Sequence, residues 1–463
     1  MIKQNAIAVF DIGKTNKKLL LFNEQYQIVF EQSAQFDEIK DEDGFPCEDI
    51  LALTEWIQGS LNQVMNVDCA EIKAINISAY GASFVHVNKE CWPIAPLYNY
   101  LKPFPEKLTQ KFYALYGGAI NFSQITASPI LGNLNSGLQL WRLKYEQPGL
   151  FNQIACSLHL PQYLSSIITK KNYSDITSIG CHTALWDFRK NGYHDWVYKE
   201  NIIGKLAPVF PSDATIQASW GKHVLLVGIG MHDSSAALIP YLLHFTDPFI
   251  LLSTGTWNIS LNPFNHAKLT EDDLNKDCLC YMDYQGKQVK ASRLFAGYEH
   301  EEQTKRLGGH FHVSSDYYRT IAFDASIISK LPPINEKRSP RRGPAMLKAP
   351  EFAQRTLSDF SDYETAYHQL MLDIIFQQIH STNLVLQNTD AKRIFVDGGF
   401  SRNPVFMNLL AMYFPQLEVY GATLSQASAL GAALAIHRYW NDEAMVGDMI
   451  QLKLFSSKLD SSF

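Results

Sequence analysis

Residues 224–261 read VLLVGIGMHDSSAALIPYLLHFTDPFILLSTGTWNISL, and this stretch decides how the rest of the chain is interpreted. Its first apolar run, 224–227, predicts a buried strand, and Gly228 and Gly230 then clear space around the acidic residue Asp233. A carboxylate at the C-terminal edge of a strand lies where open α/β sheets bind their ligands. The sequence therefore indicates a ligand site that contains Asp233.

The second half of the stretch adds a turn suited to phosphate. Small residues at 234–243 predict a tightly packed helix, and the apolar runs 249–252 and 257–261 predict two strands. The Ser-Thr-Gly-Thr turn between these strands contains Gly255 and Thr256, and its hydroxyls and backbone N–H groups suit phosphate oxygens. A carboxylate and a phosphate turn joined by one helix indicate phosphoryl transfer.

The N-terminus repeats the strand–turn–strand pattern. Apolar runs at 6–12 and 17–22 flank the polar turn 13–16. The Gly-Lys-Thr triplet of this turn is not a P-loop, because Ala8 stands where a P-loop has its first glycine and a strand rather than a helix follows. We therefore expect a hairpin that approaches phosphate, and two domains of related topology.

The size, charge and cysteine content of the chain limit the class of protein to which it can belong. Its 463 residues predict two domains, which we expect to meet near residues 240–248. A net charge of −6 gives no electrostatic reason to expect a nucleic acid or an anionic membrane as partner. No apolar run approaches the length of a membrane span and the N-terminus lacks a signal-peptide core, so we expect a cytoplasmic protein. The scattered cysteines argue against a disulfide framework, and no Cys or His cluster has metal-site spacing.

A third turn of small residues follows the predicted strand 72–77. It contains Gly81, Ala82 and Ser83, and strand structure is expected to resume at 84–87. Two interpretations are equally favoured for this segment. It is either a wall of the substrate pocket or a plain hairpin between paired strands.

Two long stretches read as irregular structure. Residues 93–135 are rich in Pro, Gly, Tyr and Asn and lack clear periodicity, so we expect binding loops there. The proline-rich stretch 331–350, with the basic run 337–342, predicts an exposed connector. Apolar spacing predicts helices at 48–67, 137–145, 160–169 and 359–388.

A last glycine turn lies in the C-terminal quarter. The predicted strand 394–396 runs into Gly398 and Gly399, which allow close backbone approach by a bulky ligand such as a nucleoside. Asn403 precedes a proline and predicts the N-cap of a helix. Residues 424–440, built on Ala and Gly, are expected to pack beneath this turn.

Taken together, these motifs resemble those of the FGGY carbohydrate kinases, within the actin-like ATPase superfamily. The resemblance extends over nearly the whole chain, and the motifs occur in the family's order. Segment 10–16 resembles the first phosphate motif, 253–257 the second and 397–403 the adenosine motif, while 230–234 resembles the catalytic-base region. The resemblance implies an α/β fold of two actin-like (ribonuclease H-like) ATPase domains with an interdomain active-site cleft.

The resemblance also implies a role for each motif. Asp233 would be the catalytic base, a role compatible with a structural one as helix N-cap, and Asp11 would orient Mg²⁺ through water. The residues expected to bind ATP are Gly13, Lys14, Thr15, Asn16, Lys18, Gly255, Thr256, Gly297, Gly398, Gly399 and Asn403. The residues expected to contact the sugar are Gly81, Ala82, Ser83, His232 and Ser234.

An N-terminal FGGY domain, 1–245, would carry the sugar site, the first phosphate motif and the base. A C-terminal FGGY domain, 246–463, would carry the second phosphate motif and the adenosine site. Two departures from the family pattern stand out: Lys14 occupies a position where the family usually has a small or hydroxyl residue, and segment 97–101 lacks the Asp-x-Arg that many members carry near their sugar.

The implied reaction is transfer of the γ-phosphoryl group of ATP to a hydroxyl of a ketose. The His-Asp-Ser and Thr-Gly-Thr-Trp motifs are most similar to those of rhamnulokinases and next to those of fuculokinases. A deoxyketose such as L-rhamnulose or L-fuculose is therefore expected, with a xylulose-like ketose or a polyol as the alternative. The alternative from another class is a nucleotide-dependent conformational switch on the same fold. We expect a monomer or homodimer that has a small sugar as its partner and neither nucleic acid nor membrane.

Overall fold

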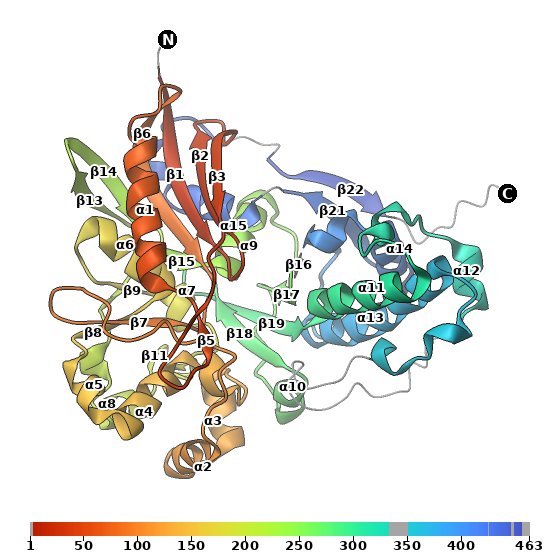
Figure 1. Cartoon of the computed structure of the whole chain (residues 1–463), viewed down its shortest axis with the longest axis horizontal. Coiled ribbons are helices and arrows are strands. Elements are labelled where there is room, and N and C mark those ends of the chain that lie inside the picture. Colours follow the sequence, from red (N-terminus) through yellow and green to blue (C-terminus); the bar gives the residue numbers. More distant parts are fainter. Residues whose placement is uncertain (1–2, 333–350, 425, 446–448, 456–463) are drawn as a thin grey trace. The chain divides into compact units, whose positions relative to one another are not determined.

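The computed structural model describes residues 3–332, 351–424, 426–445 and 449–455, and the chain forms two compact units (Figure 1). The predicted connector containing the basic run 337–342 lies almost wholly outside the described residues. Among the described helices, none is long and apolar enough to cross a membrane. The first unit comprises Met1–His244, Cys280–Gln288 and Gln426–Met449, and the second comprises Phe245–Leu279, Val289–Ser425 and Ile450–Phe463.

The first unit is built on a mixed sheet. Its strands, in spatial order, are β13 (Thr215–Trp220), β14 (His223–Gly228), β6 (Ala70–Ala79), β1 (Gln4–Ile12), β2 (Lys17–Asn23) and β3 (Ile28–Ala34). Strands β1, β2 and β3 are antiparallel neighbours, whereas β6 runs parallel to both β1 and β14. The two-residue strand β15 (Met231–His232) pairs in parallel with the end of β6. The C-terminal ends of β1, β6 and β15 therefore lie at one edge of the sheet.

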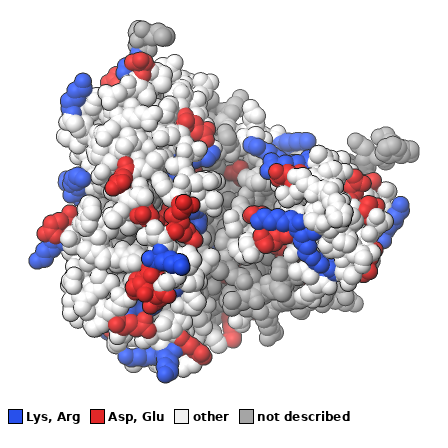
Figure 2. Space-filling model, in the orientation of Figure 1, with Lys and Arg blue, Asp and Glu red and all other residues white. Residues whose placement is uncertain are grey.

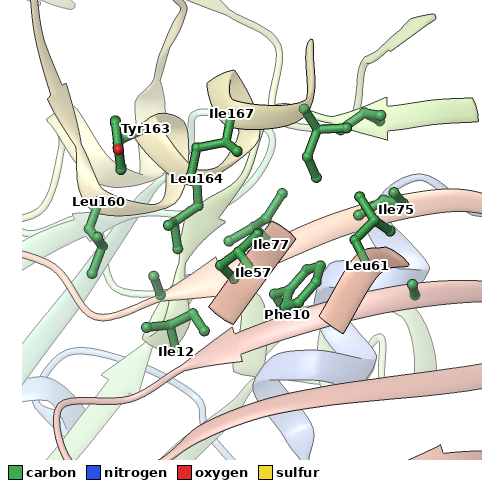
Figure 3. Packing of buried hydrophobic residues seen from close by; sticks show 14 of the residues in the cluster. Phe10, Ile12, Ile57, Leu61, Ile75, Ile77, Leu160, Tyr163, Leu164 and Ile167 are labelled. Atoms are coloured by element: carbon green, nitrogen blue, oxygen red, sulfur yellow. The ribbon is translucent and has the colours of Figure 1, made fainter. Parts of the chain in front are cut away.

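One face of this sheet carries the hydrophobic core shown in Figure 3. The helices that cover it are α1 (Ile50–Val64) and α6 (Leu160–Thr169). Phe10 of β1 and Ile77 of β6 point toward Ile57 and Leu61 of α1, and Leu164 of α6 lies in the same cluster. These side chains are fully buried, so apolar burial of this face stabilises the sheet edge that bears the polar residues.

The opposite face is covered by α9 (Asp233–His244) and α15 (Ala427–Ala435). A Cβ atom on Gly431 would overlap the carbonyl oxygen of Ala236, so only glycine lets these helices approach so closely. The buried amide of Asn76 on β6 donates to the carbonyl of Ala432 at 2.7 Å. Residues 427–435, which were expected to pack beneath the C-terminal glycine turn, form α15 and pack on α9, β1 and β6 of the first unit.

The second unit repeats the topology of the first. Its strands, in spatial order, are β18 (Cys278–Met282), β19 (Gln288–Leu294), β17 (Asn258–Asn262), β16 (Phe249–Thr254), β20 (Arg393–Gly398), β21 (Glu418–Thr423) and β22 (Gln451–Phe455). As in the first sheet, three antiparallel strands (β16, β17, β19) are followed by two parallel ones (β20, β21) and a final antiparallel edge strand (β22). The related topology expected for the two halves is therefore present.

The helices of the second unit include one much longer than the others described. Figure 1 shows this helix, α13, side by side with α11. The second-unit helices are α10 (Glu271–Asn275), α11 (Ala296–Phe311), α12 (Ala325–Lys330), α13 (Tyr363–Leu386) and α14 (Pro404–Tyr413). Helix α11 includes Gly297, and Asn403 caps α14 by accepting from the backbone N–H of Phe406, as predicted.

The rest of the first unit corrects two expectations. The stretch 93–135 contains the helices α2 (Glu106–Leu115) and α3 (Ala119–Thr126). Apolar spacing does not reveal α2, because that helix buries only Phe112 and Tyr113. The hairpin interpretation of 72–87 is wrong, because β7 (Phe84–Val87) pairs with the distant β8 (Cys156–His159) instead of β6. The predicted helices at 48–67, 137–145, 160–169 and 359–388 are confirmed, with ends that differ by a few residues.

The remaining elements of the first unit are short. Its other helices are α2 (Glu106–Leu115), α3 (Ala119–Thr126), α4 (Ser136–Glu146), α5 (Pro148–Gln153), α7 (Ile176–Ile179), α8 (Asp195–Lys199) and α16 (His437–Trp440). Its small sheets pair β4 (Ile39–Lys40) with β5 (Pro46–Cys47), β7 (Phe84–Val87) with β8 (Cys156–His159), β9 (Ser174–Asp175) with β12 (Val209–Phe210), and β10 (Trp186–Asp187) with β11 (Gly192–Tyr193). On the face drawn in Figure 2, acidic and basic side chains are interspersed rather than gathered by sign.

Candidate active site

Asp233 stands at the junction of β15 and α9, as the first residue of the helix. Its side chain is 35% exposed, and Oδ1 accepts from the backbone N–H of Ser234 at 2.6 Å and from the Ser234 hydroxyl at 3.2 Å. The Nε2 atom of His232 lies 3.3 Å from the same oxygen. Asp233 is thus oriented through Oδ1 while it stays accessible from outside.

His232 is buried beside Asp233. A Cβ atom on Gly81 would lie 2.9 Å from the imidazole ring, and the Sγ of Cys181 lies 3.5 Å from Nε2. Burial lowers the pKa of His232 below its usual value, although the neighbouring Asp233 carboxylate raises it. The imidazole is therefore neutral at physiological pH. Its Nδ1 is buried and has no hydrogen-bond partner among the described residues.

The turn after β6 reaches this pair through its first residue. Gly81 is half-buried against His232, whereas Ala82 and Ser83 are buried. The carbonyl of Ala82 accepts from the amide of Gln139 at 2.9 Å. Three residues of this turn were predicted to contact the sugar. Of these, only Gly81 is partly exposed, and it lies next to His232.

The first phosphate turn, 13–16, is a tight polar turn between β1 and β2. The backbone N–H of Gly13 donates to the carbonyl of Asn16 at 2.9 Å, and Thr15 and Asn16 are exposed. Lys14 forms an ion pair with Glu38 at 3.1 Å. The unusual lysine is thus already neutralised by an acidic neighbour.

Lys18 lies in β2 and is directly opposite Asp11 in the antiparallel register with β1. Its amine pairs with Glu31 at 3.0 Å, on the next strand of the meander. Lys18 also lowers the pKa of Asp11, which places the lysine and this carboxylate in one electrostatic neighbourhood.

Asp11 is held by Ser428, a residue that lies in none of the predicted site motifs. The hydroxyl of Ser428, on α15, lies 2.9 Å from both carboxylate oxygens of Asp11. The pKa of Asp11 is raised to about 6, mainly by burial and also by the negative charge of Asp233, against the lowering effects of the Ser428 and Ser78 hydrogen bonds and of Lys18. The Asp233 carboxylate therefore lies close enough to disfavour the charged form of Asp11.

A buried ion pair supports the first phosphate turn from inside. Lys17, with 2% of its side chain exposed, lies 2.5 Å from Glu48 and donates to the carbonyl of Lys14 at 2.9 Å. The other Glu48 oxygen accepts from the hydroxyl of Tyr80 at 2.6 Å, and the backbone N–H of Tyr80 donates to Ile12. The network joins the phosphate turn to the residue that precedes Gly81.

In the second unit, the turn after β16 is backed by close backbone packing. Gly255 and Thr256 are exposed, and a Cβ on Gly255 would meet only the Trp257 carbonyl, at 3.9 Å. On Gly297, a Cβ would overlap the carbonyl of Gly255, and the N–H of Tyr298 donates to the carbonyl of Thr256 at 3.2 Å. Gly297 thus supports the turn, whereas the surface of Gly255 stays open.

The turn after β20 packs on the same strand end. A Cβ on Gly398, whose φ is +87°, would overlap the carbonyl of Thr254, whereas a Cβ on Gly399 would meet it only at 4.0 Å. The hydroxyl of Thr254 donates to the carbonyl of Asp397 at 2.5 Å and accepts from the N–H of Phe400 at 3.0 Å. The two predicted nucleotide turns are therefore packed against each other, whereas the exposed side of Gly399 takes no part in this packing.

Asn403 is fully engaged in the fold. Its Oδ1 caps α14, and its Nδ2 donates to the hydroxyl of Tyr367 at 2.7 Å, which is also 3.0 Å from His300. Any contact of Asn403 with a nucleotide would therefore use its backbone. Burial raises the pKa of Asp397 to about 6. No cluster of three or more His, Cys, Asp or Glu in the described parts of the chain could hold a metal ion.

Comparisons with known proteins bear on this arrangement. Residues 6–238 match the N-terminal domain of the FGGY family of carbohydrate kinases, and residues 246–444 match the carbohydrate kinase FGGY C-terminal domain. This chain belongs to the FGGY family. A rhamnulokinase of Oceanobacillus iheyensis is 21% identical over 272 residues, and the alignment spans 54% of this chain and 54% of that relative.

Solved structures of two kinases show a similar fold. A carbohydrate kinase from Novosphingobium aromaticivorans has a TM-score of 0.76 at 21% identity, covering 98% of this chain and 95% of that one. A ligand-bound xylulose kinase from Lactobacillus acidophilus has a TM-score of 0.78 at 15% identity, with coverages of 98% and 94%. The predicted fold class, two α/β domains of the actin-like ATPase kind, is confirmed.

Proposed function

We propose that this FGGY family member is an ATP-dependent sugar kinase that transfers the γ-phosphoryl group to a hydroxyl of a ketose. The observation that carries the proposal is the pairing of two carboxylates, Asp233 and Asp11, at one edge of the first sheet. Separate carboxylates for the proton and for the metal are what phosphoryl transfer to an alcohol requires.

Asp233 is assigned as the general base. As the acceptor oxygen bonds to the γ-phosphorus, the bond between that phosphorus and the oxygen of the departing ADP breaks, and the acceptor proton passes to Asp233. Since Oδ1 is engaged by Ser234 and His232, we assign Oδ2 to the acceptor hydroxyl. A side chain that is partly exposed yet fixed in orientation suits this role.

Asp11 is assigned to Mg²⁺, and its surroundings fit a divalent cation. Burial and Asp233 both penalise its negative charge, and a cation would relieve that penalty. Mg²⁺ bound with a nucleotide uses one or two carboxylates together with water and phosphate, so a larger cluster of acidic ligands is unnecessary. When bound, the ion would neutralise charge that develops on the transferred phosphoryl group.

The nucleotide is assigned to the open glycines of the second unit. Gly255, Thr256 and Gly399 present exposed backbone, and Gly297 and Gly398 hold that backbone in place. The turn 13–16, with its exposed Thr15 and Asn16, would approach the phosphates from the first unit. The cleft that the family resemblance implies between the domains stays a prediction.

For the acceptor, we propose an uncharged ketose, with L-rhamnulose or L-fuculose first and a xylulose-like ketose or a polyol as the alternative. A neutral His232 beside Gly81 suits hydroxyl groups rather than a carboxylate. The rhamnulokinase relative favours the deoxyketoses, whereas the structural likeness to a xylulose kinase supports keeping the alternative.

The test is a screen of ketoses and polyols in which ADP formation is measured with ATP and Mg²⁺. We expect ADP formation that depends on added acceptor, with L-rhamnulose or L-fuculose among the best. ATP hydrolysis that no acceptor in the screen stimulates would favour the nucleotide-dependent conformational switch.

The open surface of Gly399 gives a test of the nucleotide assignment. Gly399→Val should fold normally, because its Cβ meets no atom closer than 4.0 Å, but its side chain should obstruct the nucleoside. We expect the KM for ATP to rise about 10-fold or more, since steric overpacking costs about 1–3 kcal/mol, while the acceptor KM is unchanged. Steady-state kinetics and thermal melting check both statements.

The matched control for Gly399→Val is Gly398→Ala, in the adjacent position. Its smaller side chain should destabilise the fold, because Cβ would overlap the Thr254 carbonyl and φ is positive. If Gly399→Val leaves the ATP KM unaltered, the nucleotide binds elsewhere.

A further inference from the structure

The short strand that delivers the base is held by a side chain as well as by the sheet. Strand β15 has only two residues, and the backbone N–H of His232 donates to the Oγ1 of Thr177 at 2.9 Å. Thr177 is fully buried and lies in the four-residue helix α7. A hydroxyl that is remote in the sequence therefore fixes the peptide that joins Met231 to His232, the residue directly before Asp233.

The Thr177 hydroxyl has only one orientation available. Its hydrogen is donated to Oδ1 of Asp175, a carboxylate that is itself fully buried. The same carboxylate accepts from the backbone N–H groups of Thr177, at 2.9 Å, and Ser178, at 3.2 Å, and Oδ2 accepts from the Ser212 hydroxyl. With its hydrogen committed to Asp175, Thr177 can only accept from His232.

The same segment also reaches the His232 ring. Cys181, just beyond α7, lies 3.5 Å from Nε2, and Gly180 packs against Met282 so closely that a Cβ would overlap that side chain. The Tyr281 ring meets the His232 ring edge-on, with centroids 5.3 Å apart. The backbone and the ring of His232 are thus both fixed, by residues 177 and 181 and by Tyr281, and all of them belong to the first unit. The direction of the next residue, Asp233, is therefore fixed too.

We propose that Thr177, oriented by Asp175, is a positioning residue for the base Asp233. The inference rests on the proposed kinase function. A purely local role for Asp175 is to cap α7, and it uses the two backbone N–H groups for that. The Thr177 hydroxyl contributes nothing to an N-cap of this kind, so its bond to His232 needs a separate explanation.

The experiment compares three substitutions around one carboxylate. Thr177→Val keeps the shape but removes the hydroxyl, and should lower kcat about 10- to 100-fold with the ATP KM unchanged, because small misplacements of a reacting group are that costly. Thr177→Ser keeps the hydroxyl and should restore kcat. Ser212→Ala removes a hydroxyl from the other oxygen of Asp175 and should lower the melting temperature while kcat stays within about twofold of the parent.

The decisive readout is non-additivity. If Thr177 acts through Asp233, Thr177→Val should reduce kcat no further in an Asp233→Asn background. The inference is overturned if folded Thr177→Val keeps normal kcat, if Ser212→Ala loses as much kcat, or if the two effects multiply. Should Thr177→Val not fold, Thr177→Ala is assayed instead, and the same outcomes decide. Normal turnover of Asp233→Asn alone would instead contradict the proposed base.

Discussion

The Asp233→Asn variant is expected to turn over its acceptor about 10²–10⁴-fold more slowly than the parent chain, while it binds ATP normally. Asparagine keeps the size of the side chain and an oxygen that can accept from Ser234, but it cannot take a proton. The measurements are kcat with the best acceptor of the screen, ATP affinity by titration, and the melting temperature.

The Asp233→Asn result separates chemistry from structure. Helix α9 begins at Asp233 itself, and the carboxylate accepts from the very next residue instead of capping the second or third N–H of the helix. Its removal should therefore cost less stability than a full N-cap, which is worth about 1 kcal/mol, and Asp233→Ala should melt close to the parent. Near-normal turnover by Asp233→Asn would show that another group accepts the proton.

The Asp11→Asn variant should lose activity and gain stability. Removing the carboxylate assigned to Mg²⁺ is expected to lower kcat on the order of 100-fold or more, since even groups that only orient a metal ligand cost about 10- to 100-fold. Stability should move the other way, because the folded chain raises the pKa of Asp11 from 3.8 to about 6.

The sign of the stability effect follows from proton binding. Between pH 4 and 6 the folded state holds the Asp11 proton more tightly than the unfolded chain, so this group makes folding less favourable as pH rises. The pKa of Asp11 is raised by its own burial and by the negative charge of Asp233. Ser428 and Lys18 lower the same pKa. The penalty, roughly 1–3 kcal/mol for a partly exposed group, is fully present above pH 6 and absent below pH 4.

Melting curves without Mg²⁺ check the stability prediction. Asp11→Asn should melt higher than the parent at pH 8 and no higher at pH 4. Ser428→Ala, which removes a hydrogen bond that favours the charged form, should melt lower than the parent at pH 8. A parent chain that melts above Asp11→Asn at pH 8 would show that the Asp11 charge stabilises the fold.

The fold and the open parts of the site could be predicted from local patterns. Apolar runs gave the strands at 224–227 and 249–252, and exposed glycines such as Gly255 and Gly399 lie where their turns predict. These features depend on neighbours a few residues away, so the sequence displays them directly. The residues that hold the site residues in place cannot be predicted in this way, because they are distant in the sequence. Ser428 is 417 residues from Asp11, and Thr177 is 55 residues from His232.

Two packing partners that the sequence does not reveal were hidden for the same reason. The Ala and Gly content of 424–440 predicts close helix packing, and Gly431 confirms it, but composition does not identify the partner. The sequence of β7 likewise predicts a strand, but nothing in it indicates that β8 is the neighbouring strand. Non-local pairing is decided by the whole fold and leaves little trace in one segment.

Helix α15, residues 427–435, fixes the order in which the protein can mature on the ribosome. Proteins with several domains commonly complete the N-terminal one during synthesis. Here, when His244 has emerged, Asn76, Ala236 and Asp11 still lack the contacts that α15 supplies nearly 200 residues later. The first unit therefore reaches its final packing only after residues 427–435 have been made, and a nascent chain cut before residue 427 leaves one face of the first sheet without the helix that covers it.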